Sequence, residues 1–273
     1  MGGEVNNIVA DLHMHSTFSD GKFSPEQIDA LFSDLNFQAI SITDHDTLDH
    51  VAYISKNIDK FTLDIIPGVE VSCKFEGIDM HLLVYYVDKS INFLTDYFES
   101  YRLLRINRVE EIISKLKKNG IALNPKNIID KFNNPSRLHI AQQLVLNGYA
   151  KSIKLAFKKF LIKSSKYYVP INKISLIDLV DCLTPFNCIT SIAHPIISLG
   201  KKNLGKILNM NIDGVEAFHP THSLQDESIL LSICNENSLL VTGGSDFHGW
   251  NKNDFRIGRY GLNNKKFNFF QLN

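Results

Sequence analysis

Short apolar runs alternate with amphipathic segments along the first hundred residues of the chain. The runs at residues 7–14, 37–46, 63–73 and 79–87 predict strands. Between them, residues 24–36 and 48–58 have helical spacing, and Ser24 followed by Pro25 is typical of a helix start. This alternation of strand and helix predicts βα units around a mostly parallel sheet.

The pattern changes after about residue 92, where helical spacing replaces the alternation. Residues 93–120, 134–149 and 152–163 have the spacing of amphipathic helices. A run at 167–171 predicts a strand, after which helices at 174–186 and 223–237 alternate with strands at 188–195, 212–220 and 239–248. We therefore expect one α/β barrel, residues 1–98 and 169–273, interrupted by a helical insertion at residues 99–168, which is longer than an ordinary connection.

Composition and charge exclude several classes of protein. Lys and Arg number 29, as do Asp and Glu, so the whole chain has no net charge that would attract duplex DNA or an anionic membrane. No apolar run reaches the ~18 residues of a membrane span. The four cysteines form no CxxC pair, which indicates reduced thiols rather than a zinc ribbon or a disulfide framework. We expect a cytoplasmic protein with no membrane association and no obligate protein partner.

Histidines and acids gather near the ends of the predicted strands. The carboxyl ends of strands line the ligand site in α/β sheets and barrels, so we expect these side chains to converge. At least five of the ten histidines lie there beside carboxylates, which unrelated structural roles would not explain. In chain order the residues are Asp11, His13, His15, Asp20, Asp44, His45, Asp46, Glu70, His81, His194, His219, Asp246 and His248.

The residue types in this group are those of a metal site. His13 and His15 are two residues apart, so on a strand they point to the same face. Two neutral imidazoles suit a divalent metal, and carboxylates such as Glu70 and Asp246 can bridge ions. Several such groups together suggest two or three metals rather than one. Nitrogen and oxygen ligands without thiolate favour zinc, manganese or iron.

Some of these residues have a simpler interpretation. His219 taken alone would be a structural residue, Asp46 would cap the following helix, and His139 would pack on its own helix. Asp11 would support a histidine ligand without touching the metal. No serine lies in a GxSxG elbow. The glycine pair in TGGSD would allow the close backbone approach that places Asp246.

Six segments, DLHMHSTFSDG, ITDHDT, PGVEVS, HLLVY, AHP and GSDFHG, resemble in sequence and order the motifs of the PHP (polymerase and histidinol phosphatase) family of metal-dependent phosphoesterases. The resemblance implies a distorted (β/α)7 barrel that holds three divalent ions, with manganese expected and zinc or iron as alternatives. By analogy, the first ion would be held by His13, His15, Glu70 and Asp246, the second by Glu70, His81 and His194, and the third by Asp20, His45 and His248.

The helical block is similar to the insertion of a PHP subfamily that includes 3′,5′-nucleoside bisphosphate phosphatases and 5′→3′ exoribonucleases. This similarity implies that the substrate is a nucleotide or the 5′ end of a short RNA, hydrolysed by a metal-activated hydroxide. Glu70, Asp246 and His219 are the expected catalytic residues, with His219 as a candidate proton donor to the leaving oxygen. A histidinol-phosphate or other small-metabolite phosphatase is the alternative enzyme, and a metal-binding module without activity is the alternative outside enzymes.

Basic residues of the insertion are candidates for holding a phosphate. Arg102 and Arg105 are three residues apart and share a helix face, and Arg137 opens a later helix. Lys166 lies near the end of the insertion. The planar guanidinium suits bidentate phosphate contacts. The alternative is that these cations form the solvated face of an amphipathic helix.

Overall fold

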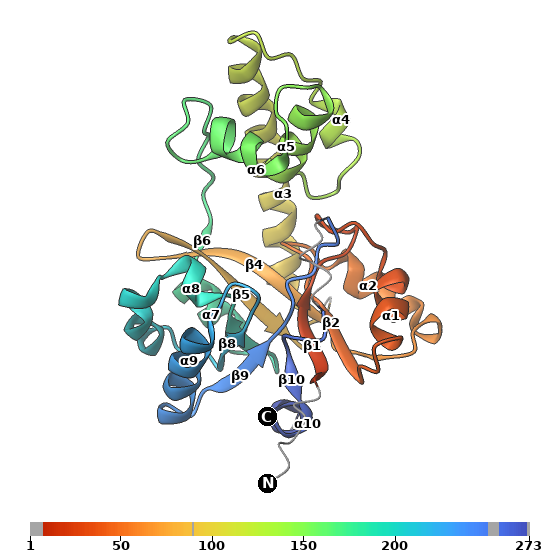
Figure 1. Ribbon diagram of the computed structural model, residues 1–273, viewed down its shortest axis with the longest axis vertical. Helices are drawn as coiled ribbons and strands as arrows, with labels where there is room; N and C mark the ends of the chain where they lie inside the picture. Colours follow the sequence, from red (N-terminus) through yellow and green to blue (C-terminus); the bar gives the residue numbers. More distant parts are fainter. Residues whose placement is uncertain (1–7, 89, 251–256, 272–273) are drawn as a thin grey trace.

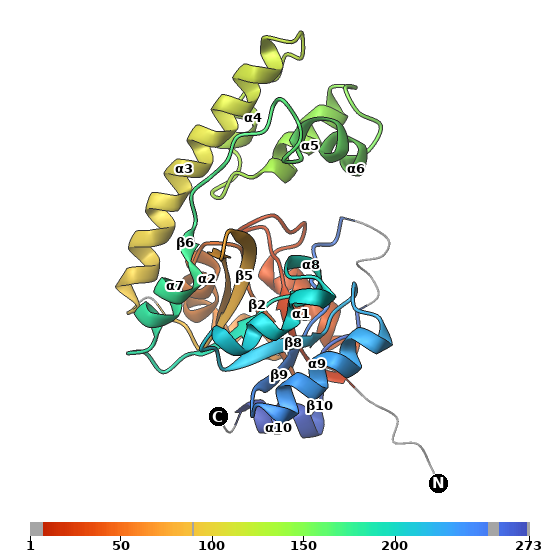
Figure 2. The same cartoon turned by 90° about the vertical axis from the view of Figure 1, so that its left-hand side faces the viewer.

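The computed structural model describes residues 8–88, 90–250 and 257–271. Strands and the helices around them form one part of the molecule, and a group of helices stands above it (Figure 1). One long helix, α3, runs along the side from the lower part into the upper group (Figure 2). The polar start of the chain, residues 1–7, lies outside the described residues.

The described strands form two sheets rather than one continuous ring. The first sheet has the order β10-β1-β2-β3, and the second has the order β6-β4-β5-β7-β8-β9. In the first sheet the strands are β1 (Ile8–Met14), β2 (Ala39–Ile42), β3 (Asp64–Ile65) and β10 (Leu262–Asn263). In the second they are β4 (Gly68–Phe75), β5 (Ile78–Tyr85), β6 (Ile174–Ser175), β7 (Ile189–Ile192), β8 (Gly214–Phe218) and β9 (Leu240–Gly243).

Backbone hydrogen bonds join the two sheets near the ends of their strands. The nitrogen of Asp46 donates to the oxygen of Glu70 at 3.0 Å, and the nitrogen of His15 donates to the oxygen of Phe247 at 2.9 Å. These contacts belong to isolated bridges, and no ladder continues across them. The mixed α/β fold with parallel strand pairs is therefore as predicted, and among the described strands only isolated bridges join the two sheets where a closed barrel would have continuous ladders.

Helices cover both sheets and also form the upper group. Around the sheets lie α1 (Pro25–Ser33), α2 (Asp49–Lys56), α7 (Leu176–Leu183), α8 (Pro195–Ser198), α9 (Leu224–Glu236), α10 (Asn264–Gln271) and the 3₁₀ segments η1 (Ile58–Lys60) and η3 (Lys201–Asn209). The upper group contains α3 (Asn92–Lys117), α4 (Lys126–Ile129), α5 (Arg137–Leu146), α6 (Ile153–Ala156) and the π-helical turn η2 (Phe157–Leu161). The predicted start of α1 is confirmed, because Ser24 caps it in a capping box.

Two strand predictions need correction. The strand predicted at 63–73 is split at Pro67, which has no N–H for a ladder, so the chain leaves β2 and joins β5 there. Most strand pairs are parallel, as predicted, but β5 runs antiparallel to its neighbours β4 and β7. The run at 167–171 is not a strand.

The run at 167–171 is held by side chains instead of a ladder. The carbonyl oxygens of Tyr168 and Val169 accept hydrogen bonds from Lys115 Nζ, at 2.9 Å, and Arg108 Nε, at 2.8 Å. Both donors lie on α3. Tyr167 and Val169 are buried in the core of the helical group. Apolar residues in this run therefore reflect packing against helices, which looks the same in sequence as a short buried strand.

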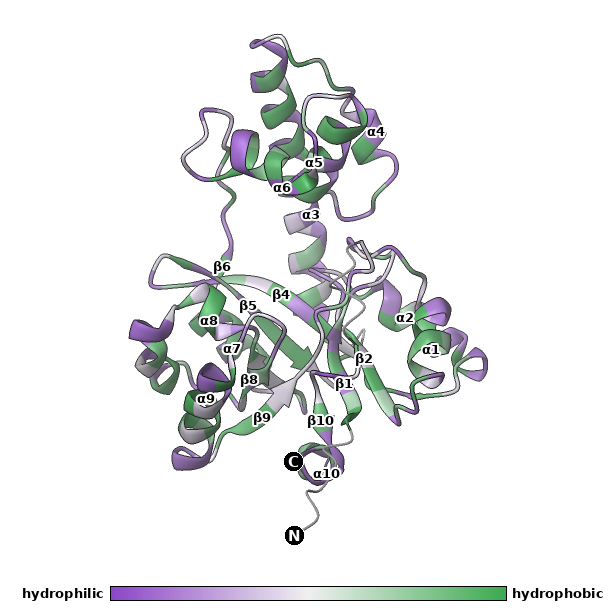
Figure 3. Ribbon diagram, in the orientation of Figure 1, coloured by the Kyte–Doolittle hydropathy of each residue, from purple (hydrophilic) through white to green (hydrophobic). Residues whose placement is uncertain are grey.

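The helix α3 contributes to two separate hydrophobic clusters. Leu94 and Phe98 pack with the second sheet and α7, whereas Ile112 and Leu116 pack with α5 and η2. Hydrophobic residues accordingly concentrate in the strands and inside the helical group, and the outer helix faces are hydrophilic (Figure 3). Within the described ranges, no helix combines the length and the apolar character needed to cross a membrane.

His139 links the stability of the helical group to pH. Its ring stacks on Phe132 with centroids 3.7 Å apart, and its Nδ1 accepts a hydrogen bond from the backbone nitrogen of Ser136 at 3.1 Å. Burial lowers the pKa of His139 to about 4. The unfolded chain binds this proton at about pH 6.5, so stability is full above that pH and falls as the pH drops toward 4.

We expect His139→Gln to remove part of this acid sensitivity. Gln keeps a capping acceptor at the third helical position but has no proton to bind. Between pH 7 and pH 5 the wild type should lose roughly 2 kcal/mol more unfolding free energy than the variant, measured from urea curves. Equal losses in both proteins would contradict a buried neutral imidazole at this position.

Candidate metal centre

The nine predicted metal ligands lie together at one end of the sheets. β1 carries His13, and His15 follows it directly, while the loops after β7 and β9 carry His194 and Asp246. Ligand atoms of these residues fall into four groups, each with its atoms within 4.8 Å of one another. The groups are His15, Asp20, His45 and His248; His13, Glu70 and His194; His13, His15 and Asp246; and His45, Glu70 and His81.

His81 reaches the cluster because β5 runs against its neighbours. β5 is antiparallel to β4, and His81 lies opposite Ser72 in that pair. The amino-terminal half of β5 therefore lies at the edge where the parallel strands end. A residue near the start of an antiparallel strand thus joins residues from the ends of the others.

Glu70 lies at the centre of the cluster and is 1% exposed. Its Oε2 faces three ring nitrogens at 3.1–3.2 Å, those of His13, His15 and His45. Its Oε1 faces two more, His81 Nδ1 at 2.8 Å and His194 Nε2 at 3.1 Å. The carboxylate thus has one oxygen on each of two neighbouring groups of imidazoles, which is the arrangement of a bridging ligand.

Asp246 and Asp20 complete the cluster on one side. Asp246 Oδ1 lies 3.2 Å from His15 Nε2 and 3.6 Å from His248 Nδ1. Asp20 Oδ1 lies 3.3 Å from His248 Nε2. Both carboxylates therefore face imidazoles that also belong to the groups described above.

Several atoms in the cluster have the environment expected of metal ligands. Among the described residues, His13 Nε2, His15 Nε2, His45 Nδ1, His81 Nδ1 and Glu70 Oε2 are buried without a hydrogen-bond partner. Buried polar atoms are rarely left without a partner unless something else, such as an ion, satisfies them. The donor set is nitrogen and oxygen without thiolate, which suits divalent ions such as zinc, manganese or iron. The residues present therefore fit divalent metal ions.

Electrostatics in the cluster keep its carboxylates charged. Burial opposes ionisation of Glu70, but the imidazoles of His45, His81 and His13 outweigh it and hold the pKa of Glu70 well below its usual range. Burial also opposes the charged form of His248, yet Asp20 and Asp246 raise its pKa to about 10. A metal ion bound here would therefore meet anionic oxygens and would displace protons from histidine.

Close backbone approach holds the cluster together, as the TGGSD pattern predicted. A Cβ added to Gly244 would lie 2.5 Å from the Cβ of His13, and one added to Gly21 would lie 2.1 Å from the backbone oxygen of His15. Asp246 and His194 have φ angles of 49° and 31°, a left-handed conformation that costs non-glycine residues roughly 1–3 kcal/mol. The surrounding structure therefore imposes the position of these two side chains.

Sequence reasoning missed Glu216, which supports two of the candidate ligands. It lies on β8, is fully buried, and its Oε1 lies 2.9 Å from His13 Nδ1. Its Oε2 accepts a 2.7 Å hydrogen bond from the backbone nitrogen of His194. The sequence did contain a signal, because Glu216 interrupts the apolar run GVEAF, which is expected to be buried. An acid is almost never fully buried unless it is paired, so a partner for Glu216 was to be expected.

We expect Glu216→Gln to weaken metal binding and activity about 10- to 100-fold. Gln preserves the volume but removes the charge that orients the His13 ring. Titration with manganese and steady-state kinetics would measure both effects. Unchanged metal affinity together with unchanged turnover would show that Glu216 only fills space.

The aspartates near the cluster have different roles. Asp11 accepts hydrogen bonds from the backbone nitrogens of Ser245, at 3.0 Å, and His13, at 3.3 Å, so it fixes the backbone rather than an imidazole. The prediction that Asp46 caps the next helix is wrong: α2 has no side-chain cap, and Asp46 instead forms an ion pair with Arg105. His219 Nε2 lies 3.4 Å from Asp246 Oδ2 and is nearly fully buried.

A cationic cleft of about 180 Å³ opens next to the candidate ligands. Three of them line it, Asp20, His45 and His81, from the side of the sheets. From the helical side it is lined by cations and aromatic rings. The helical cations are Arg105, Arg108 and Arg137, the rings are Tyr101 and Phe157, and Lys173, just before β6, adds a fourth cation.

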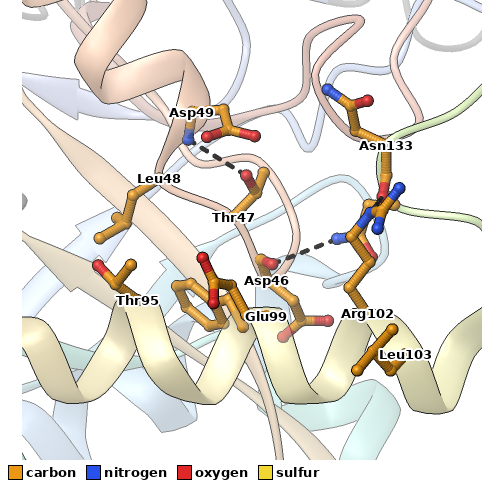
Figure 4. Close-up of a pocket in the computed structure, with 11 residues that line it drawn as sticks. Asp46, Thr47, Leu48, Asp49, Thr95, Glu99, Arg102, Leu103 and Asn133 are labelled. Atoms are coloured by element: carbon orange, nitrogen blue, oxygen red, sulfur yellow. Dashed lines mark hydrogen bonds between the residues drawn. The ribbon is translucent and has the colours of Figure 1, made fainter.

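Two of the four basic residues predicted to hold phosphate lie outside this cleft. Arg102 lines a neighbouring pocket of about 550 Å³, where its Nε donates to the carbonyl oxygen of Asn133 at 2.6 Å (Figure 4). Lys166 is exposed, and its Nζ donates to Asn119 Oδ1. Arg105 and Arg137 line the cleft, together with Arg108 and Lys173.

Comparison with known proteins gives consistent results. The model of the PHP domain family matches residues 11–173. A 5′-3′ exoribonuclease, Rnm, of Escherichia coli is 28% identical over 254 residues, 88% of this chain and 85% of the relative. A 3′,5′-nucleoside bisphosphate phosphatase of Chromobacterium violaceum is 27% identical over 250 residues, 87% of this chain and 86% of the relative.

A solved structure has the same fold over nearly its full length. The crystal structure of a putative metal-dependent phosphoesterase from Bifidobacterium adolescentis superposes with a TM-score of 0.83 and 25% identity. The superposition covers 96% of this chain and 95% of that one. Since the family model matches more than half of the sequence, this chain belongs to the PHP domain family and is a hydrolase, a metal-dependent phosphoesterase.

Proposed function

We propose that this enzyme hydrolyses phosphate esters of nucleotides, namely 3′,5′-nucleoside bisphosphates or the 5′ ends of short RNAs. One observation carries the proposal: the cleft that exposes Asp20, His45 and His81 is also lined by four cations and two aromatic rings. Cations suit phosphate, and aromatic rings suit a nucleobase. The names of the relatives from E. coli and C. violaceum support the same substrate class.

The nine clustered side chains would hold the metal ions in the three sets expected from the sequence. His13, His15, Glu70 and Asp246 form the first set, Glu70, His81 and His194 the second, and Asp20, His45 and His248 the third. Manganese is the metal we propose for the first tests, and we propose three ions per chain. Divalent ions, when bound, neutralise phosphate charge and lower the pKa of coordinated water from about 15.7 toward about 7.

The protein's own side chains have separable tasks in this proposal. Glu70 supplies the negative charge that holds the imidazoles of two sets together. Arg137 and Arg108 bind phosphate oxygens from the opposite wall of the cleft. Asp246 faces His13 and His15 with one oxygen and His219 with the other. Because His219 Nε2 is directed at Asp246, we assign His219 the task of orienting that carboxylate rather than donating a proton to the leaving group.

We further propose that the helical insertion, residues 99–168, is the substrate-facing part of the enzyme. It supplies Tyr101, Arg105, Arg108, Arg137 and Phe157 to the cleft wall. The sheets supply the candidate metal ligands. This division places the choice of substrate in the insertion and the bond-breaking chemistry in the strands.

A substrate panel tests the proposal directly. Adenosine 3′,5′-bisphosphate, a 5′-phosphorylated oligoribonucleotide and histidinol phosphate would be compared by kcat/KM with manganese present. We expect turnover of at least one nucleotide substrate, and a selective loss of it in Arg137→Ala. If histidinol phosphate were hydrolysed far better than both nucleotide substrates, the enzyme would instead be a small-metabolite phosphatase.

A further inference from the structure

The cations of this chain are unevenly distributed, although its total charge is balanced. Residues 131–173 contain nine Lys or Arg and no Asp or Glu. This segment forms most of the upper group after α4 (Figure 1). A segment whose charged side chains are all positive creates a local positive potential, which attracts polyanions even when the protein as a whole is neutral.

Some of these Lys and Arg side chains line a groove that continues from the cleft beside the candidate metal ligands. The groove has a volume of about 260 Å³ and shares Arg108, Arg137 and Lys173 with the cleft. Beyond those three residues it adds Lys74, from β4, and Lys163, from the insertion. Asp79 is the acid among its described lining residues. The lining is therefore strongly cationic, and it leads away from the candidate metal centre.

The cations of the groove are only partly neutralised by the protein itself. Asp79 pairs with Lys163 at 2.7 Å and with Lys173 at 3.5 Å. Within the described part of the chain, no carboxylate lies within ion-pair distance of Arg108 or Arg137. Their guanidinium groups are held instead by the carbonyl oxygens of Val169 and Leu161. Two neighbouring guanidiniums without a counter-ion make this a site that an external anion would stabilise.

Arg108 is largely buried and lies near the charge of Arg137. Burial, followed by the nearby charge of Arg137, lowers the pKa of Arg108 to about 10. Both guanidiniums also face the ring of Tyr168, at 5.5 Å and 5.8 Å from its centroid. Aromatic rings between cations are typical of surfaces that bind single-stranded nucleic acid. An acidic peptide would use the cations but would gain nothing comparable from the rings.

We propose that this groove binds the next phosphodiester of a short single-stranded RNA whose 5′ end lies in the cleft. Lys74 and Lys163 are then specificity-determining residues, because they favour an oligoribonucleotide over a mononucleotide. Arg108, Arg137 and Lys173 serve both positions. This inference rests on the proposed function and narrows its substrate to RNA.

The test compares Lys74→Gln/Lys163→Gln with a matched control. Binding of a 5′-phosphorylated pentaribonucleotide with a 3′ fluorophore would be measured by anisotropy in EDTA, which separates binding from turnover. We expect the affinity to fall about tenfold. The slope of log K against log salt concentration should flatten by about 0.7 for each lost phosphate contact. With manganese, kcat/KM for adenosine 3′,5′-bisphosphate should change less than twofold.

The control is Lys154→Gln/Lys158→Gln, which removes two exposed cations of the insertion outside the groove. Its pentaribonucleotide affinity should stay within about twofold of the wild type. An equal loss in both double variants, an unchanged affinity in the groove variant, or equally tight binding of oligoglutamate would overturn the inference. Each of these results leaves nucleotide hydrolysis by the wild type standing. Failure of the wild type to hydrolyse any nucleotide would overturn the proposed function instead.

Discussion

Glu70→Gln should lower kcat by about a thousandfold or more and reduce the amount of bound metal. Glu70 is the carboxylate whose two oxygens face five imidazole nitrogens at 2.8–3.2 Å. Gln has the same shape but no charge, and its amide nitrogen would direct N–H groups at those rings. Loss of several kcal/mol of charge stabilisation corresponds to this change in rate, since about 1.36 kcal/mol is a factor of ten.

Metal content by mass spectrometry and kcat on a nucleotide substrate with manganese would measure the effect. The matched control is Glu236→Gln, an exposed Glu on α9 that contacts Ser232, for which both quantities should be unchanged. Retention of full metal content and more than a tenth of the wild-type kcat by Glu70→Gln would remove Glu70 from the centre of the site.

Arg105→Met should destabilise the folded protein by about 3–5 kcal/mol. Arg105 Nη2 pairs with Asp46 Oδ2, and both side chains are largely buried. Asp46 also accepts a 2.6 Å hydrogen bond from the backbone nitrogen of Ser72. Removal of the guanidinium leaves the carboxylate buried without its counter-ion. Urea unfolding at pH 7 would measure the loss.

Arg105→Met/Asp46→Asn should recover most of that stability. Asn is neutral, it still accepts from Ser72, and it tolerates the left-handed backbone of residue 46, whose φ is 49°. Burial opposes ionisation of Asp46, but Arg105 outweighs it and lowers the pKa of Asp46. The pair therefore stabilises the wild type above about pH 4 and loses that effect as the pH falls through the folded pKa. A double variant no more stable than Arg105→Met would show that the loss arises from packing.

The candidate metal ligands could be predicted because local pattern determines their position. His13 and His15 share a face through the two-residue repeat of a strand, and His45, His194 and Asp246 follow apolar runs. The direction of β5 was not available from its apolar pattern, because that pattern is the same for parallel and antiparallel strands. The strand-end pattern therefore included His81 without explaining how the start of a strand reaches the cluster, and the antiparallel pairing of β5 with β4 now explains it.

Glu216 and the partner of Arg105 could not be predicted from local pattern. The contact of Glu216 with His13 joins residues 203 positions apart, and that of Arg105 with Asp46 joins residues 59 apart. Each depends on which elements become neighbours in the fold. A buried acid or an arginine on a helix face signals in sequence only that a partner exists, and substrate is one of several possible partners.

The helix α3 has a mechanical consequence for the cleft. Its 26 residues form a rod about 39 Å long, with one end embedded beside the sheets and the other in the helical group. Arg105 and Arg108 lie between those two anchored ends. The cleft wall that carries them is therefore a helix packed at both of its ends. Substitutions that loosen either hydrophobic cluster would therefore move these two guanidinium groups relative to the candidate metal ligands, although the clusters themselves lie away from the cleft.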